Sequence, residues 1–500
     1  MKKYFKFLPF ILTIILRIPD FFQPYWYTDT GIYSAIGESI NHGGILYKTI
    51  IDNKPLIIYY LYALLEKLPL SLMFSIQFIS LVCALITEYL IYKICEIRFN
   101  RDIGLISMFV LTILLGTDFI HSNGANVETI FILFSTLSIY IFFLKENIYK
   151  YIYLAGIILG IGFLIKVPVI FDGIFLIFYM LFTYKFLDFF KKSFIYGLGI
   201  ITPVVLFLLY EISIGNIGNT IKYTFTSNFS YVAIFNHFYG ISYTYINLLV
   251  YFIILLASYS LYKKGKINID YIFFTLWLSS DLFVILLTGR PYIHYIIQIL
   301  PAVSIFFAYI IYNFRNWNLK KSLIISLSTI FVVFLLGEYF FRNELSWQVY
   351  DNFSNTFPFY SNFIEYSLGS ITRTQYFDTF PYNTNVVHEK RIYTANINYK
   401  MASLLDTLNV KDKDIFIAAN FPWVYYMTGS YTTHFYTADF IYGSSNNDKR
   451  ELLLSLEKNR PYAILFYNDG YTIKGFDSFL KKNYSLYKYE YGAKLYKLKG

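Results

Sequence analysis

The chain has 500 residues, of which 56% are hydrophobic and only 15% are charged, and its mean hydropathy is +0.48. Soluble globular proteins are typically about 45–50% apolar and about 25% charged, so this composition excludes an ordinary soluble fold. The formal net charge of +10 does not require a nucleic-acid partner, because membrane proteins concentrate Lys and Arg beside the cytoplasmic ends of their spans. We therefore expect membrane lipids, and no nucleic acid, among the partners.

Eleven apolar segments approach the ~20 residues that a helix needs to cross a bilayer. We expect spans at 5–22, 69–92, 103–120, 127–144, 150–165, 168–184, 194–212, 243–261, 270–288, 294–312 and 322–340. The first segment follows two lysines and lacks the small-x-small cleavage pattern of a signal peptide, so we interpret it as an uncleaved span.

Basic residues predict the orientation of these spans. If the N-terminus is cytoplasmic, six inner segments each carry two or three Lys or Arg, at positions 2–6, 93–101, 145–150, 185–192, 263–266 and 315–321. The outer loops after the first hold only Lys166, Lys222 and Arg290. This alternation predicts a multi-pass protein of the cell membrane with a cytoplasmic N-terminus and an extracytoplasmic C-terminal region.

The first outer loop, residues 23–68, contains two short helical patterns. Gly31–Asn41 places isoleucines on one face and ends at a Gly-Gly pair, and Pro55–Glu66 begins with proline at an early helical position. Amphipathic helices of this kind can lie in the membrane interface.

The rest of the chain divides after the last span. Residues 1–340 form the predicted transmembrane module, 341–389 an aromatic connector, and 390–500 a small extracytoplasmic α/β domain. Short apolar runs at 414–418 and 462–466 predict buried strands, and 449–458 predicts an amphipathic helix between them.

Two charged groups stand out in the first outer loop. Asp29 precedes the first short helix, where Thr28 or Asp29 could cap the helix or Asp29 could act as a general base at the membrane surface. Lys54 could reach lipid headgroups or bind a substrate phosphate as a point charge. Asp52 either orients Lys54 or is solvated.

Further ionisable residues lie in the later outer loops. Glu128 begins the fourth span, where it could simply favour the helix dipole or take part in function. Lys166 lies between two apolar spans and needs an anionic partner there. His121 is more typical of a structural loop histidine.

The fifth outer loop and the start of the span that follows it contribute Arg290 and His294, within Arg-Pro-Tyr-Ile-His-Tyr at 290–295. The arginine suits bidentate phosphate binding or anchoring at the interface beside the tyrosines. Because groups near membrane depth usually face a cavity or one another, we expect several of these outer groups to converge on one cavity.

Four local patterns together resemble the GT-C superfamily of membrane glycosyltransferases, in the branch of protein O-mannosyltransferases and lipid A aminoarabinose transferases. Residues 29–33 and 43–47, which include Tyr33, are similar to the first-loop Asp-Glu-x-x-Tyr motif with its downstream Gly-x-x-Tyr element. Residues 52–56 resemble a Lys-Pro-Pro-Leu segment, 126–128 an Asn-x-Glu element, and 290–295 an Arg-x-x-x-His-Tyr element. The resemblance covers about residues 1–315.

Two positions depart from the family pattern: Thr30 replaces an acidic residue and Leu56 replaces a proline. The aminoarabinose transferases bind zinc, but no zinc ligands can be matched in this sequence. We therefore assign no metal site, and a divalent metal or other cofactor is not assignable.

The resemblance implies an all-α, GT-C-type membrane module and inverting transfer of a sugar from a polyprenyl-phosphate donor to an extracytoplasmic protein, glycolipid or polysaccharide. It favours Asp29 as the base. It also assigns Lys54, Arg290 and Lys166 to the donor phosphate, with support from the residues Asp52, Glu128, His294 and Tyr33. Two alternatives stay open: a flippase for lipid-linked sugars, which should need charged groups between both faces, and a non-catalytic envelope assembly protein.

Overall fold

The computed structural model describes residues 5–226, 228, 242–265, 267–287, 292–313, 344–381, 384–386, 391–393, 396–434, 446–467 and 473–500. Its contacts divide the chain into two compact units. Unit 1 comprises Met1–Ile18, Phe78–Ile214 and Thr226–Thr356, and unit 2 comprises Pro19–Gln77, Gly215–Phe225 and Phe357–Gly500. Each unit is described by itself.

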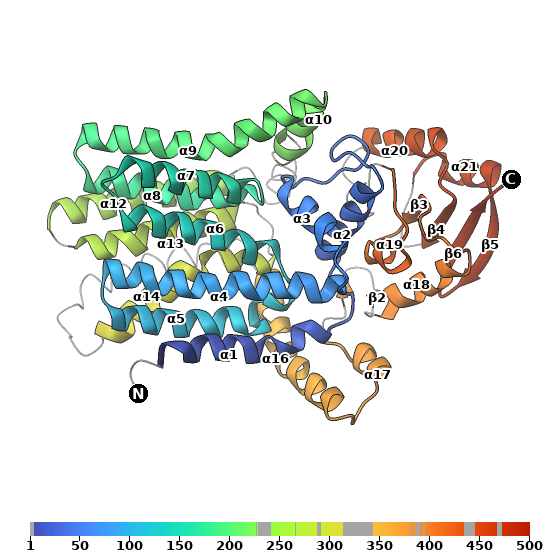
Figure 1. Ribbon diagram of the computed structural model, residues 1–500, viewed down its shortest axis with the longest axis horizontal. Coiled ribbons are helices and arrows are strands. Elements are labelled where there is room, and N and C mark those ends of the chain that lie inside the picture. Colours follow the sequence, from blue (N-terminus) through green and yellow to red (C-terminus); the bar gives the residue numbers. More distant parts are fainter. Residues whose placement is uncertain are drawn as a thin grey trace. The chain divides into compact units, whose positions relative to one another are not determined.

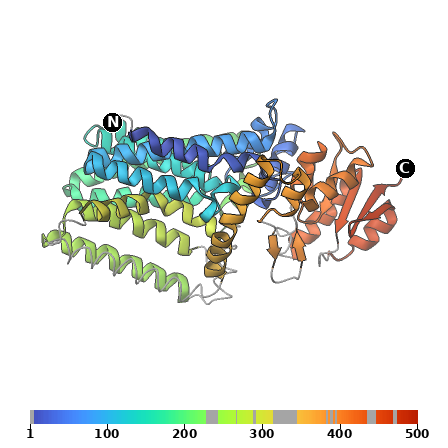
Figure 2. The same ribbon diagram turned by 90° about the horizontal axis from the view of Figure 1, so that it is seen from below.

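Unit 1 is built from long apolar helices that run nearly parallel to one another in two perpendicular views (Figure 1, Figure 2). These are α1 (Leu8–Leu16), most of α4 (Leu72–Arg98), α5 (Arg101–Gly116), α6 (Val127–Leu144), α7 (Tyr149–Phe163), α8 (Ile170–Thr183), α9 (Phe186–Ser213), α12 (Ser242–Lys263), α13 (Ile269–Leu287) and α14 (Leu300–Asn313). Short 3-10 segments join several of them, including η3 (Asp118–Ile120), η4 (Ser122–Gly124), η5 (Val167–Val169) and η7 (Ile293–Ile299).

The helices follow the apolar segments of the sequence. A helix coincides with each predicted span up to residue 312, and the one predicted at 322–340 lies outside the described residues. Four helical stretches among the described residues are long and apolar enough to cross a membrane, namely Leu72–Arg98, Val127–Leu144, Phe186–Ser213 and Ile293–Tyr312. These helices identify a membrane protein.

Glycines allow a close contact between α7 and α9 in unit 1. A Cβ added to Gly156 on α7 would lie 2.9 Å from the Cα of Gly199 on α9. Small residues of this kind let membrane helices approach backbone to backbone, where van der Waals packing stabilises the pair.

Unit 2 combines the first outer loop with the C-terminal region. Its helices are α2 (Thr28–Asn41), α3 (Ile57–Leu65), α10 (Ile217–Ile221), the second half of α16 (Glu344–Ser367), α17 (Arg373–Asp378), α18 (Asn396–Asp406), α19 (Trp423–Thr428), α20 (Asn446–Lys458) and α21 (Phe476–Asn483). A separate hairpin pairs β1 (Thr384–Val386) with β2 (Arg391–Tyr393).

The sheet of unit 2 has four strands in the order β3-β4-β6-β5. β3 (Ile415–Ala418) and β4 (Ala463–Tyr467) are parallel, with Ile415 opposite Ala463. β6 (Ala493–Leu498) pairs antiparallel with β4 and with β5 (Tyr484–Glu490). The structure confirms both predicted strands and the predicted helix between them, and adds β5 and β6.

α2 is enclosed by protein. It packs against α3 and α19, and Ile32 and Ile36 are at most 1% exposed. Ala35 belongs to the hydrophobic core that also contains Leu405 and Val424. Protein from α3 and from the C-terminal region therefore encloses α2, the helix that the sequence suggested for the membrane interface.

Candidate functional site

Asp29 is a helical residue in the first turn of α2. The N-cap position belongs to Tyr27, and no side chain caps the helix there. The alternative in which Thr28 or Asp29 caps the helix is therefore wrong, because both residues lie inside it. The half-buried Asp29 carboxylate accepts a hydrogen bond of 3.5 Å from the Tyr33 hydroxyl one turn later. A carboxylate in the first turn also interacts favourably with the helix dipole.

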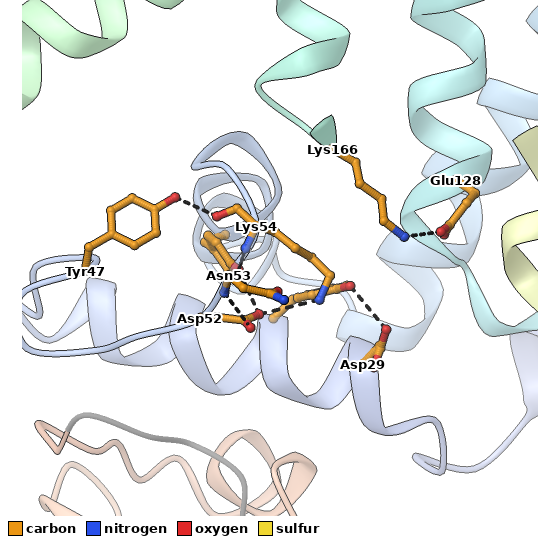
Figure 3. A network of polar contacts seen from close by, with 9 residues as sticks. Asp29, Tyr47, Asp52, Asn53, Lys54, Glu128 and Lys166 are labelled. Atoms are coloured by element: carbon orange, nitrogen blue, oxygen red, sulfur yellow. Dashed lines mark hydrogen bonds and ion pairs between the residues drawn. The ribbon is translucent and has the colours of Figure 1, made fainter. Parts of the chain in front are cut away.

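The segment before α3 carries Asp52 and Lys54. Asp52 is 5% exposed, and its carboxylate accepts hydrogen bonds from the Tyr59 hydroxyl at 2.7 Å and from the Asn53 N–H at 2.8 Å. The Lys54 ammonium lies 3.7 Å from the same carboxylate (Figure 3). Asp52 therefore orients Lys54 and is not merely solvated.

Two tyrosines fix the backbone at Lys54. The Tyr47 hydroxyl donates to the Lys54 carbonyl at 2.6 Å, and the Lys54 N–H donates to the Tyr59 oxygen at 3.2 Å. Burial, followed by the nearby Asp52 charge, raises the pKa of Tyr59 well above its usual value. Tyr59 therefore stays protonated and continues to donate to Asp52.

Tyr33 connects Asp29 with Lys54. Its hydroxyl donates to Asp29, and the Lys54 ammonium lies 5.0 Å from the centroid of its ring, within the range of a cation–π interaction. The edges of Tyr59 and Tyr62 pack around the same ring, at centroid distances of 6.0 and 5.5 Å. We call Asp29, Tyr33, Asp52, Lys54 and Tyr59 the loop cluster.

A second group of charged side chains lies within unit 1. Glu128 is in the first turn of α6 and is 2% exposed. Its carboxylate accepts a hydrogen bond from Lys166, which precedes η5 (Figure 3). His294 Nε2 lies 3.9 Å from the same oxygen, and the Lys166 ammonium lies 4.5 Å from the centroid of the Tyr295 ring. We call Glu128, Lys166, His294 and Tyr295 the bundle cluster.

Buried hydrogen bonds hold the segments that carry the bundle cluster. Gln298 of η7 donates to the Pro168 carbonyl of η5 and to the Asp172 carboxylate, both at 3.2 Å. Trp277 donates to the other Asp172 oxygen at 2.8 Å. The segments that carry Lys166 and His294 are thereby tied to each other and to α8, which is in turn bonded to α13.

The loop before α6 has an unusual backbone. His121 and Ala125 have φ angles of +65° and +48°, in the left-handed region. A non-glycine residue pays a steric penalty there, and such residues cluster at functional sites. Asn126 donates to the His121 carbonyl at 2.5 Å, and the His121 and His294 rings are 6.4 Å apart.

Arg290 lies outside the described residues. Within the described part of the chain, no group of three or more His, Cys, Asp or Glu could hold a metal ion, so these residues do not fit a zinc site.

The sequence did not predict the roles of Tyr59 and Gln298, because it gives no signal that a tyrosine or glutamine on a helix supports a distant charge.

Comparisons with known proteins identify the fold. Residues 53–211 match the PMT_2 family, described as dolichyl-phosphate-mannose-protein mannosyltransferase. A search of curated proteins gives no match.

Solved structures resemble nearly the whole chain. ArnT from Cupriavidus metallidurans bound to undecaprenyl phosphate is 10% identical, with a TM-score of 0.58 over 98% of this chain and 97% of that one. The apo form of the same protein is 11% identical, with a TM-score of 0.54 over the same shares. The apo oligosaccharyltransferase of Archaeoglobus fulgidus is 11% identical, with a TM-score of 0.46 over 93% and 70% of the two chains.

The matched segment contains Lys54, Glu128 and Lys166, and the structural likeness extends over both units. Residues 53–211 therefore resemble the PMT_2 mannosyltransferase family, and the whole chain shares the fold of ArnT from Cupriavidus metallidurans.

Proposed function

We propose that this protein transfers a sugar from a polyprenyl-phosphate-linked donor to an extracytoplasmic acceptor, a protein or an envelope glycolipid or polysaccharide, with inversion at the anomeric carbon. The observation that carries the proposal is the loop cluster, in which Tyr33 contacts both a half-buried carboxylate, Asp29, and a lysine, Lys54. A base and a phosphate-binding cation are the two groups that such a transfer needs.

Asp29 is the proposed base. The acceptor hydroxyl oxygen attacks the anomeric carbon, the bond from that carbon to the phosphate oxygen breaks, and the hydroxyl proton passes to the Asp29 carboxylate. The electron pair of the broken bond leaves with the lipid phosphate. The first-turn position of Asp29 favours the ionised form that can accept this proton.

Lys54 is the proposed ligand of the leaving phosphate. Its ammonium is held 3.7 Å from Asp52 and its backbone is fixed by Tyr47 and Tyr59, so the charge is preorganised where negative charge develops. Lys166 and Arg290 are proposed as further phosphate ligands, with Glu128 and His294 supporting Lys166.

The comparisons support the lipid carrier. ArnT of Cupriavidus metallidurans, which shares this fold, is known bound to undecaprenyl phosphate. A donor with a long isoprenoid tail keeps that tail in the bilayer, so a membrane-embedded enzyme can meet its phosphate at the surface.

Replacement of the proposed base tests the proposal. Asp29→Asn keeps the size of the side chain, removes the proton acceptor, and should lower turnover by ~100- to 10,000-fold, the usual worth of general-base catalysis. Transfer should be measured with purified protein and a radiolabelled lipid-phosphate sugar, with donor binding as the folding control. A correctly folded Asn variant that transfers at the wild-type rate contradicts the role of Asp29.

The orientation needs its own test. We propose that the N-terminus is cytoplasmic and the C-terminal region extracytoplasmic. The native Cys83 and Cys95 are buried, so an introduced cysteine can be labelled selectively. Glu457→Cys on α20 should react with an impermeant maleimide in intact cells, and Glu146→Cys, between α6 and α7, only after permeabilisation. The reverse pattern contradicts the orientation.

A further inference from the structure

Two carboxyl groups meet where α2 packs on α3. Glu38 lies in the last turn of α2, and Glu66 is the C-cap residue of α3. Their side chains hydrogen-bond to each other. A helix C-terminus disfavours negative charge, so both groups occupy positions where ionisation is unfavourable.

The contact between the two helices is tight. A Cβ added to Gly37 would lie 2.8 Å from the Ala63 nitrogen, and Asn41 donates to the Ala63 carbonyl at 2.9 Å. Glu66 accepts hydrogen bonds from Ser34 at 2.9 Å and from Asn41 at 3.3 Å. Glu66, at the end of α3, is therefore tied to two residues of α2 that lie about two helical turns apart.

Few charges act on this pair. The charges of His42 and Asp412 act on the ionisation of Glu38, and the charge of Glu38 acts on that of Glu66. His42 Nε2 and an Asp412 carboxylate oxygen lie 3.5 Å apart. Tyr62 also faces Glu66 and is fully enclosed. Burial, reinforced by the Glu38 charge, raises the pKa of Glu66 to about 10. Two carboxylates in contact cannot both ionise cheaply.

We propose that Glu38 and Glu66 share one proton across the α2–α3 contact, and that Glu66 is a positioning residue that holds the Asp29-bearing helix against α3. The shared proton supplies the hydrogen bond between the carboxyl groups. Its loss places two negative charges in contact at two helix C-termini and weakens the packing of α2 on α3.

The pair lies close to the loop cluster. Ser34 follows Tyr33 directly in sequence, and the Tyr62 ring packs 5.5 Å from that of Tyr33. Burial raises the pKa of Tyr62, and the Asp29 and Glu66 charges raise it further. A shift of α2 along α3 therefore moves Tyr33 relative to Lys54; this consequence for catalysis rests on the proposed function.

The proposal predicts the sign of a pH dependence. The pKa of Glu66 is about 10 in the folded protein, against an ordinary value of 4.5. Between these values the folded state holds a proton that the unfolded state lacks, so stability falls as pH rises. The contribution is fully present below the ordinary value and is lost as pH approaches the folded value.

Thermal unfolding of the purified full-length protein tests the shared proton. Glu66→Gln keeps a hydrogen-bond donor toward Glu38 and cannot ionise. Between about pH 5 and about pH 9, within the window of this linkage, the wild-type midpoint should fall and that of Glu66→Gln should fall less. The variant should be the more stable protein at alkaline pH. Glu457→Gln, an exposed control on α20, should follow the wild type.

A second variant keeps the test valid if the first does not fold correctly. Glu38→Gln removes the partner charge and should also flatten the decline of the midpoint. A wild-type slope in both variants overturns the shared proton.

Sugar transfer tests the positioning role separately. The wild-type rate should fall at alkaline pH, and Glu66→Gln should retain transfer to higher pH. Equal alkaline losses of transfer, with a flattened unfolding profile, overturn the positioning role and uphold the shared proton. A wild-type protein without transfer contradicts the proposed function, and the unfolding profile still decides the shared proton.

Discussion

Each unit contains one lysine beside one buried acid, and the two pairs are built differently. Asp52 accepts hydrogen bonds from Tyr59 and the Asn53 N–H, with the Lys54 ammonium 3.7 Å away. Glu128 instead accepts its hydrogen bond from Lys166, and His294 stands 3.9 Å off. Asp52 remains hydrogen-bonded when Lys54 turns to a ligand, whereas Glu128 depends on its lysine.

We expect this difference to separate the proposed phosphate ligand Lys54 from an ion pair that also supports the fold. The Lys54 side chain is 17% exposed and that of Lys166 is 12% exposed, so exposure alone does not distinguish them. The two pairs are distinguished by the hydrogen-bond donors that the acid has besides its lysine. Loss of Lys54 should therefore affect donor binding first, and disruption of the Lys166 pair should affect folding first.

The largest expected effect is on stability, from Glu128→Gln. Removing one partner of a buried ion pair typically costs about 3–5 kcal/mol, because the other charge stays buried without compensation. The free energy of unfolding of the purified protein should fall by that order. Glu128→Gln combined with Lys166→Met should recover most of the loss. Equal destabilisation in the single and double variants would show that the ion pair does not support the fold.

A smaller effect, on binding, is expected from Lys54→Met. A hydrogen bond to a charged group is worth about 1.5–3 kcal/mol, so the KM for the lipid-phosphate donor should rise by roughly 10- to 150-fold. Thermal stability should stay near that of the wild type, because Asp52 keeps its other donors. Lys48→Met, an exposed lysine in the same loop, is the matched control. An unchanged donor KM would remove Lys54 from the site.

The smallest effect should come from Tyr33→Phe. The aromatic ring beneath Lys54 remains, and the hydroxyl contact to Asp29 at 3.5 Å is lost. A contact this long is weak, so turnover should fall by less than about fivefold, corresponding to less than about 1 kcal/mol. The donor KM should not change. A large rise in KM would mean that the hydroxyl, and not the ring, positions Lys54.

The sequence predicted local elements well and long-range partners poorly. Apolar runs predicted the described helices of unit 1 because a bilayer-length run has few other folded solutions. The need of Lys166 for an acid was also predictable, but its partner Glu128 lies 38 positions away. β5 was missed because its side chains are mostly exposed and it reads Tyr-Ser-Leu-Tyr-Lys-Tyr-Glu.

The environment of α2 shows the same limit. Its isoleucines correctly indicated an amphipathic helix, but a periodic pattern cannot say whether lipid or protein covers the apolar face. Trp423, which lies against Gly31 of this helix, donates to the Tyr27 carbonyl across 396 positions. Glu38 and Glu66 were likewise passed over, because acidic residues at the ends of short helices are ordinarily solvated.

Gly31 has a practical consequence for engineering. A Cβ at this position would lie 2.8 Å from Trp423 Cδ1 and 3.0 Å from Pro422 Cγ. The helix that carries Asp29 therefore packs closely against the start of α19. The first loop and the terminal region should therefore be exchanged as one unit, although they are far apart in sequence. A chimera that imports only the terminal region of a relative would bring a foreign surface against Gly31. Exchange of both segments together should preserve the fit.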